Sequence, residues 1–248
     1  MTKPQKVTKV MQVPYTIPNH LLSPGISNAK TKKNLRPTRI LYLSSANDNE
    51  LGVNLCGYSS KGCRESCLVT AGMGAFDNVA KARRNKTHYY LQDRFSFLEQ
   101  VAKEISRAAY TQSKKGLELA IRLNGTSDIK LVEMVTKAYG YMIGKNVVFY
   151  DYTKYPKKAG DYTLPSGHRY MVTLSRSEDN EDDCLRHLKD GGIVAVVFRK
   201  ELPTHWHGYP VVDGDERDDL MLDLPKGTII GLLAKGKAKY NTNNFVLN

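Results

Sequence analysis

The chain has 248 residues, of which 41% are hydrophobic and 25% are charged, and its formal net charge is +12 at pH 7. This composition is ordinary for a soluble globular protein. No apolar run approaches the roughly 18 residues of a membrane span, and the N-terminus lacks the apolar segment of a signal peptide. We therefore expect a cytoplasmic protein, in the host cell if the chain is viral, that makes no membrane contact.

The net positive charge indicates what kind of partner the protein binds, and it says little about the fold. Nucleic acid is the commonest reason for such an excess in a cytosolic chain, so we expect DNA or RNA as a partner. The alternative is a generally basic surface with no single acidic partner. The sequence leaves the oligomeric state open.

The chain begins with a segment rich in proline and lysine. Residues 1–38 contain five prolines and little periodicity, which predicts an extended basic N-terminal arm. The apolar segment Arg39–Asn47 follows and predicts the first strand. We expect two parts, the arm and a single α/β domain over residues 39–248.

Residues 76–112 have a helical pattern. Apolar residues recur at helical spacing without proline or glycine, so we expect one long helix or two with a bend near Asp93. The buried face of this segment is expected to comprise Phe95, Leu98, Ala102 and Ile105.

Strands recur through the rest of the chain, with helices at residues 130–142 and 181–189 between them. The expected strands are residues 117–128, 146–154, 169–178, 191–200, 209–216 and 227–239. Their apolar runs are mostly continuous, which is typical of strands covered on both faces of a parallel sheet. We expect the α/β class with a mostly parallel, barrel-like sheet of about seven strands, an incomplete TIM-type arrangement with a cysteine-rich loop after the first strand.

Polar residues follow the apolar part of each expected strand. In parallel sheets, ligands bind at the carboxyl ends of the strands, so these residues are expected to face a common site. The alternative is that each one only begins a solvated loop. The candidate catalytic residues are Asp151, Asp213 and Lys235, and the candidate substrate-binding residues are Asn124, Asp128, Arg176, Arg199 and Lys237.

Cys56, Cys63 and Cys67 lie within residues 54–75, which we call the cysteine loop, with the spacing C-x6-C-x3-C. Structural zinc sites use four ligands and commonly C-x2-C pairs, so this spacing favours a [4Fe–4S] cluster held by the three thiolates. Zinc is the alternative occupant, and packing or free thiols are a further alternative. His88 and Cys184 are the remote candidates for a fourth ligand.

A three-cysteine loop directly after the first strand of a parallel sheet distantly resembles the radical S-adenosylmethionine enzymes, whose usual spacing is C-x3-C-x2-C. This resemblance implies S-adenosylmethionine as a further cofactor. The only candidate for a glycine-rich motif that would bind it is "LNGTSD" after the second strand.

A second resemblance covers Leu22 to Lys239. It rests on the ordered motifs "LSPGISNAKT", "NLCGYSSKGCRESCLVTAGMG", "IRLNGTSDI", "FYDYTK", "LSRSE", "VAVVFR", "DGDERD" and "GLLAKGKAK". As a set they resemble a family of uncharacterised phage and mobile-element proteins. This resemblance implies a viral or mobile-element context and one site built from these motifs, which do not include Cys184.

Two functions follow as hypotheses. The first is an iron–sulfur protein that acts on nucleic acid or a nucleotide, with the cluster and the strand-end residues in one site. The second is a non-catalytic DNA- or RNA-binding regulator with a structural iron–sulfur or zinc site. The sequence leaves open whether the protein is an enzyme.

Overall fold

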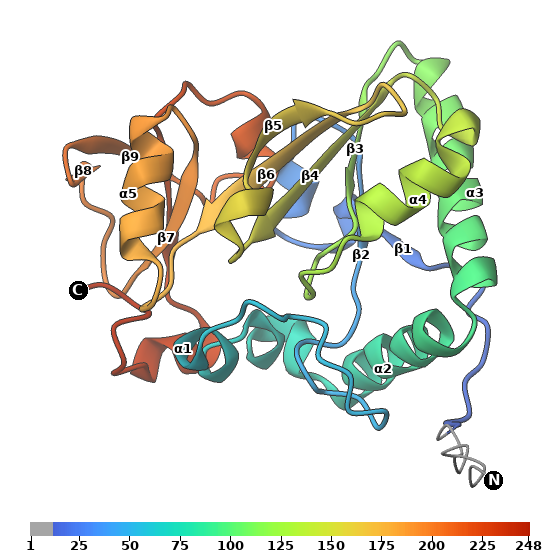
Figure 1. Cartoon of the computed structure of the whole chain (residues 1–248), viewed down its shortest axis with the longest axis horizontal. Helices are drawn as coiled ribbons and strands as arrows, with labels where there is room; N and C mark the ends of the chain where they lie inside the picture. The colour runs from blue at the N-terminus through green and yellow to red at the C-terminus, as the bar shows by residue number, and fades with distance from the viewer. Residues whose placement is uncertain (1–11) are drawn as a thin grey trace, which may run out of the picture.

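The computed structural model describes residues 12–248 as a mixed α/β fold built on one large sheet (Figure 1). Within these residues the sheet has ten strands. Nine follow the order β1-β2-β3-β4-β6-β7-β10-β9-β8, and the tenth, β5, pairs with β6 beside this path. The strands are β1 (Leu22–Pro24), β2 (Thr38–Leu41), β3 (Leu119–Arg122), β4 (Val147–Thr153), β5 (Gly160–Thr163), β6 (Arg169–Ser175), β7 (Val194–Phe198), β8 (His205–Trp206), β9 (Tyr209–Asp213) and β10 (Ile229–Leu233).

The sheet is mostly parallel, as expected. Neighbouring strands from β2 through β3, β4, β6, β7 and β10 to β9 all pair in parallel. The short strands β1, β5 and β8 pair antiparallel with their neighbours. Parallel pairing requires crossover connections, and these bring the carboxyl ends of seven strands to one edge.

The expected closure into a barrel does not occur among residues 12–248. The sheet is open, because β1 lies at one end of the strand order, β8 lies at the other, and these two strands do not pair. Both terminal strands are short, with three and two residues, so neither offers a long edge for closure. Successive parallel strands are still neighbours over most of the sheet, which explains why the sequence pattern suggested a barrel.

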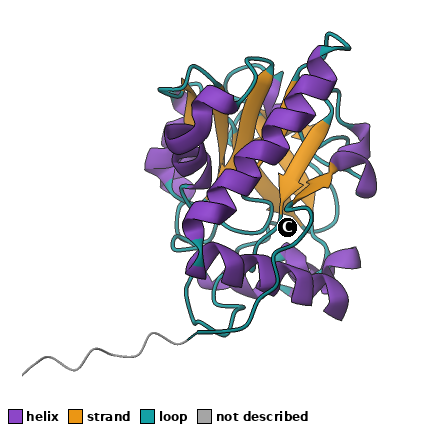
Figure 2. Cartoon of the chain, turned by 90° about the vertical axis from the view of Figure 1, so that its right-hand side faces the viewer, coloured by secondary structure: helices purple, strands orange, loops and turns teal. Residues whose placement is uncertain are grey.

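The α-helices lie on one face of the sheet and at its carboxyl edge (Figures 1 and 2). The α-helices are α1 (Lys61–Glu65), α2 (Asp77–Gln92), α3 (Arg94–Ser113), α4 (Leu131–Tyr139) and α5 (Glu181–Lys189). The short 3-10 helices are η1 (Gly25–Ser27), η2 (Thr31–Lys33), η3 (Leu68–Thr70), η4 (Gly72–Ala75), η5 (Gly140–Met142), η6 (Pro156–Lys158), η7 (Leu220–Leu222) and η8 (Gly236–Tyr240).

Strand alternation divides the core between the two faces of the sheet. Alternate residues such as Ile121 and Phe149 pack with side chains of α3 and α4, and Val194 and Val196 pack with α5. We call this the helix face. The intervening residues, such as Val148, form a separate cluster with η7 on the opposite face, which we call the η7 face.

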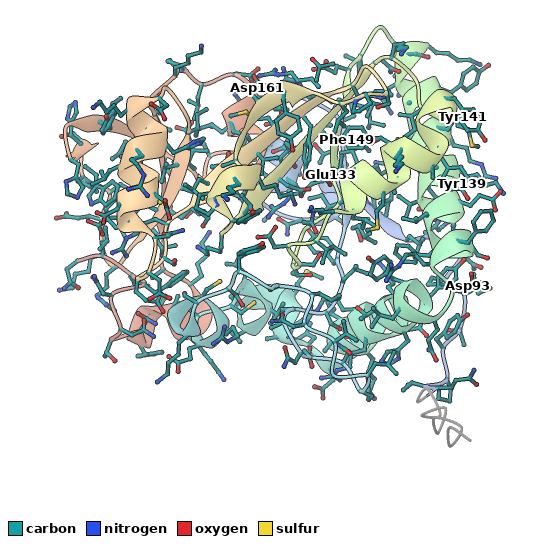
Figure 3. All side chains as sticks on the ribbon, viewed as in Figure 1. Asp93, Glu133, Tyr139, Tyr141, Phe149 and Asp161 are labelled. Carbon is teal, nitrogen blue, oxygen red and sulfur yellow. The ribbon has the colours of Figure 1, made fainter. Side chains whose placement is uncertain are left out.

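The bend expected near Asp93 is confirmed. Asp93 separates α2 from α3, as Figure 3 shows, and its side chain accepts a hydrogen bond from the backbone N–H of Ser96 at 3.2 Å. This is an N-cap, which satisfies one of the unpaired donors at the start of α3. The expected burial of Phe95 is wrong, because its side chain is 74% exposed. Phe97 takes the core position instead, packed edge-on against Tyr89 of α2.

The N-terminal segment packs on the domain where the structure describes it. β1 pairs with β2, and the Glu104 carboxylate on α3 accepts hydrogen bonds from the backbone N–H groups of Leu21 and Leu22. Residues 1–11 of the expected arm lie outside the described residues, and the boundary at residue 38 stays a prediction. Among residues 12–248, no helix combines the length and the apolar character that crossing a membrane requires.

Candidate functional site

The cysteine loop lies at the carboxyl edge of the sheet, between β2 and α2 in the chain (Figure 1). The backbone N–H of Asp128, after β3, donates to the Leu55 carbonyl at 2.8 Å. The Glu178 carboxylate, after β6, accepts from the backbone N–H of Gly62 at 2.5 Å. The loop is therefore attached to the ends of two parallel strands.

Helix α1 fixes the backbone around Cys63. Ser60 is its N-cap and accepts a hydrogen bond from the backbone N–H of Cys63 at 3.1 Å, while its hydroxyl donates to Glu178 at 2.7 Å. A Cβ added at Gly62 would lie 2.6 Å from the Phe245 Cβ, so only glycine fits here. This part of the loop is held rigidly against the C-terminal segment.

The three thiols of the loop are reduced and partly buried. The pKa of Cys56 is raised to about 12, mainly by burial and to a lesser extent by the neighbouring thiols Cys67 and Cys63. Burial also raises the pKa of Cys63, against the opposing charge of Lys154. Because both pKa values are raised, a bound cation would be needed to keep Cys56 and Cys63 as thiolates at neutral pH.

Two cations, the buried Arg83 and the half-buried Lys154, lie beside these thiols. Arg83 of α2 is 5% exposed, donates through Nη2 to the Gly74 carbonyl at 2.9 Å, and has an Nε without a partner. Lys154 donates to the Ser175 hydroxyl and to the Arg176 carbonyl, both at 2.7 Å. Burial lowers the pKa of both groups. For Arg83 the negative charge of Asp48, and after it Cys67, opposes that shift. For Lys154 the opposing groups are Cys63 first, then Cys184, Glu178 and Asp128. Neither cation makes an ion pair with a carboxylate within the described part of the chain.

The remote ligand candidates have partners of their own. The Nε2 of His88 lies 2.6 Å from a carboxylate oxygen of Glu50, close enough for an ion pair, although the two groups do not have hydrogen-bond geometry. Cys184 of α5 is fully buried in the cluster with Leu174 and Leu188, and burial raises its pKa to about 12. Across residues 12–248, no group of three or more His, Cys, Asp or Glu side chains is arranged to hold a metal ion.

Asn124 and Asp151 come together, but within the core. Asp151 is fully buried and accepts hydrogen bonds from the Asn124 backbone N–H and side-chain amide, both at 2.9 Å, and from the Tyr170 hydroxyl at 3.0 Å. Burial raises the pKa of this carboxyl, and nearby cations oppose the shift. The group ties β3, β4 and β6 together on the helix face.

Asp128 connects the loop to β4. Its carboxylate accepts from the Thr153 hydroxyl at 2.8 Å and the Lys154 backbone N–H at 3.0 Å, and it pairs with Lys158 at 3.4 Å. Its own backbone N–H reaches the cysteine loop at Leu55. Asp128 is thus the candidate residue most directly joined to both the loop and a strand end.

The remaining candidates lie in separate groups along the carboxyl edge. Arg176 is 1% exposed and pairs with Glu181 at 2.7 Å. Arg199 donates to the carbonyls of Lys239 and Asn241 and to the Asn248 side chain. Asp213 and Lys237 are exposed, and Lys235 pairs with Asp215 at 2.6 Å. The parallel sheet brings these residues to one edge, but strand alternation and local ion pairs distribute them among different surfaces.

The sequence as a whole matches one protein family, described as gene product 88, over residues 20–247. The chain belongs to this family. The expected phage-type family resemblance is confirmed at this level. Neither the curated proteins nor the solved structures contain a significant match.

Sequence reasoning missed several buried polar groups in this gene product 88 protein. Arg83, Arg122, Tyr152 and Thr173 each carry a buried polar atom without a hydrogen-bond partner. Only Arg122 left a signal, as a charged residue inside the otherwise apolar run "LAIRL". Tyr152 and Thr173 stand among residues common in strands, so only the register shows which face they share.

Proposed function

We propose that this chain is an iron–sulfur protein that acts on a nucleotide or nucleic acid, with the cluster held by Cys56, Cys63 and Cys67 at the carboxyl edge of the sheet. A [4Fe–4S] cluster can be held by three thiolates, which leaves one iron open to a substrate, a cofactor or a remote ligand. S-adenosylmethionine is a candidate for that position, and zinc is the alternative occupant of the thiols.

The observation that best supports the proposal is the positive charge beside the three thiols. Arg83 and Lys154 are cations beside the thiols, and each lacks a carboxylate partner among residues 12–248. An arginine stays charged in proteins, and burying a charge is costly unless an opposite charge compensates it. Thiolates bound to a metal cluster would supply that negative charge, whereas three neutral thiols would not.

A basic segment beside the loop supports an anionic substrate. η8 packs against η3 of the cysteine loop, and the Lys237 backbone N–H donates to the Thr70 hydroxyl at 3.5 Å. Lys237 and Lys239 are exposed there, as are Lys61 and Arg64 of α1. Lys61 lies 3.9 Å from Glu65 and Arg64 donates to Ser59, whereas Lys237 and Lys239 form no ion pair among the described residues. Such exposed cations are suited to phosphate contacts, which give affinity without sequence specificity.

The cluster is tested by purifying the full chain without oxygen and measuring its absorbance, iron and sulfide. We expect iron and sulfide in the wild type, and the loss of both when Cys56, Cys63 or Cys67 is changed to Ala. Cys184→Ala is the matched control, because this buried thiol lies on α5 and should leave the iron content unchanged. Stoichiometric zinc without sulfide would overturn the iron–sulfur proposal.

The same preparation tests the cofactor. After reduction, the electron paramagnetic resonance spectrum of the cluster should change when S-adenosylmethionine binds the open iron. An unchanged spectrum would exclude that ligand and leave the cluster proposal standing.

A regulator that binds nucleic acid without catalysis is the second candidate function. It is favoured by the state of the candidate catalytic residues, because Asp151 is enclosed by three donors and Lys235 pairs with Asp215. Both candidates predict binding that weakens steeply with salt, and Lys237→Gln should lower the salt slope by about one. Lys137→Gln, an exposed lysine on α4, is the control and should leave the slope unchanged. Turnover of a nucleotide by the wild type would decide against the regulator.

A further inference from the structure

A cluster of polar side chains lies in the middle of the η7 face. Arg122 of β3 donates through Nη1 to Asp218 at 3.0 Å, and the Tyr150 hydroxyl donates to the same carboxylate at 2.9 Å. The guanidinium of Arg122 stacks over the ring of Tyr152, with 4.8 Å between its central carbon and the ring centroid. Two adjacent strands and the loop after β9 therefore contribute to one group.

Three donors of this region have no acceptor. The Arg122 Nε, the Tyr152 hydroxyl and the Thr173 hydroxyl are all buried and lack hydrogen-bond partners among the described residues. Tyr152 and Thr173 face each other across β4 and β6 in the strand register. Buried polar groups are almost always hydrogen-bonded, and an orphan costs free energy, so three on adjacent strands of one face call for a shared acceptor.

The local charge favours an acceptor that is negative. Asp218 is contacted by two cations, Arg122 at 3.0 Å and Lys30 at 3.3 Å. Burial alone would raise the pKa of Asp218, but these cations and the Tyr150 hydroxyl hold it well below its usual range, so the carboxylate is charged. Two further carboxylates act on Tyr152, Asp215 and Asp219, and each pairs with a cation of its own, Lys235 and Arg217 respectively. The one charge of Asp218 against Arg122 and Lys30 therefore leaves an excess of one positive charge.

The geometry points to Arg122, Tyr152 and Thr173 as a binding site for an oxyanion group, a phosphate or a carboxylate, of a small ligand. All three groups donate, and oxyanions accept several hydrogen bonds at once. The three orphaned atoms are buried, but the Arg122 side chain as a whole is 13% exposed, so a ligand would enter beside this side chain.

The site adjoins the cysteine loop. Two residues beyond Tyr152 and Thr173 along their strands, Lys154 donates to the Ser175 hydroxyl. The Lys154 Nζ lies 4.8 Å from the ring centroid of Phe245, and Cys63 packs against the cluster that contains Phe245. A ligand anchored by its oxyanion would therefore extend toward the thiols. The inference rests on the proposed function only in taking this ligand to be the substrate.

The test is calorimetric titration of the full-length chain with inorganic phosphate and, separately, with acetate. We expect at least one of them to bind, and the preferred one identifies the chemistry of the group. Tyr152→Phe and Thr173→Val remove only the orphaned hydroxyls, so each should weaken binding by about tenfold. Because neither hydroxyl has a partner in the ligand-free protein, both variants should fold at least as stably as the wild type.

Tyr170→Phe is the matched control, since its hydroxyl donates to Asp151 on the helix face and its loss should leave the affinity unchanged. The inference would be overturned if neither anion bound the wild type, or if the Tyr152→Phe and Thr173→Val chains bound the anion as tightly as the wild type does. Two results separate this inference from the cluster proposal. The Cys56→Ala chain should keep its oxyanion affinity. A wild type that binds the oxyanion but holds no iron would contradict the cluster proposal alone.

Discussion

The two faces of the sheet carry polar clusters of opposite kinds. On the helix face, the Asp151 carboxylate accepts hydrogen bonds from Asn124 and Tyr170, and no side-chain polar atom of these three residues is left without a partner. On the η7 face, Asp218 is equally well bonded, but Arg122 and Tyr152 beside it keep donors that have no acceptor.

This difference in hydrogen bonding distinguishes buried polar residues that stabilise the fold from those that can bind a ligand. A cluster that satisfies itself needs nothing further and serves to hold strands together. A cluster with orphaned donors is destabilising as it stands, and it gains free energy when a ligand supplies the acceptors. The strand-end acid Asp151 therefore belongs to the scaffold by its contacts, while the neighbouring strand positions on the other face offer the ligand site.

The largest effect is expected when the self-satisfied cluster is broken. Asp151→Ala leaves the Asn124 and Tyr170 donors buried without an acceptor, and should lower the free energy of unfolding by about 3 kcal/mol. Denaturant titration measures it. Asp161→Ala is the control, because this partly exposed carboxylate pairs with Arg169 at the surface and should cost below about 1 kcal/mol. A cost for Asp151→Ala as small as that of the control would contradict the structural role.

The next effect concerns acid stability on the η7 face. The pKa of Asp218 is depressed in the folded protein, so its contribution is present above the unfolded pKa and is lost as the pH falls through the folded value. The wild type should lose about 2 kcal/mol more than Asp218→Asn as the pH is lowered from about 5 to about 2. Parallel pH curves for the two proteins would show that Asp218 is not charged in the fold.

The smallest expected effect is the difference between two tyrosines, one with a hydrogen-bonded hydroxyl and one with a hydroxyl that has no partner. Tyr170→Phe removes a hydrogen bond to Asp151 and should cost about 1 kcal/mol of unfolding free energy. Tyr152→Phe removes an orphaned hydroxyl and should change the unfolding free energy by less than about 0.5 kcal/mol, or raise it. Thermal unfolding of both variants in buffer without phosphate or carboxylate decides between them. Equal costs would remove the distinction between the two faces.

The mostly parallel sheet and the break between α2 and α3 could be predicted from the sequence. Continuous apolar runs such as "GIVAVVF" indicate strands covered on both faces, and the capping chemistry of Asp93 is local. Closure into a barrel could not be judged, because it depends on how the terminal strands β1 and β8 lie across the whole sheet. These strands, with three and two residues, are too short to leave a periodic signal.

The sequence by itself determined the three neighbouring thiols, the basic charge and the placement of polar residues at the ends of parallel strands, because each is a matter of local spacing and composition. Only the tertiary structure decided which face each residue joins. A strand reverses the direction of its side chains at every residue, so Asp151 and Tyr152, adjacent in the chain, belong to opposite clusters. The two cations beside the thiols come from α2 and from the end of β4, and folding alone brings them together.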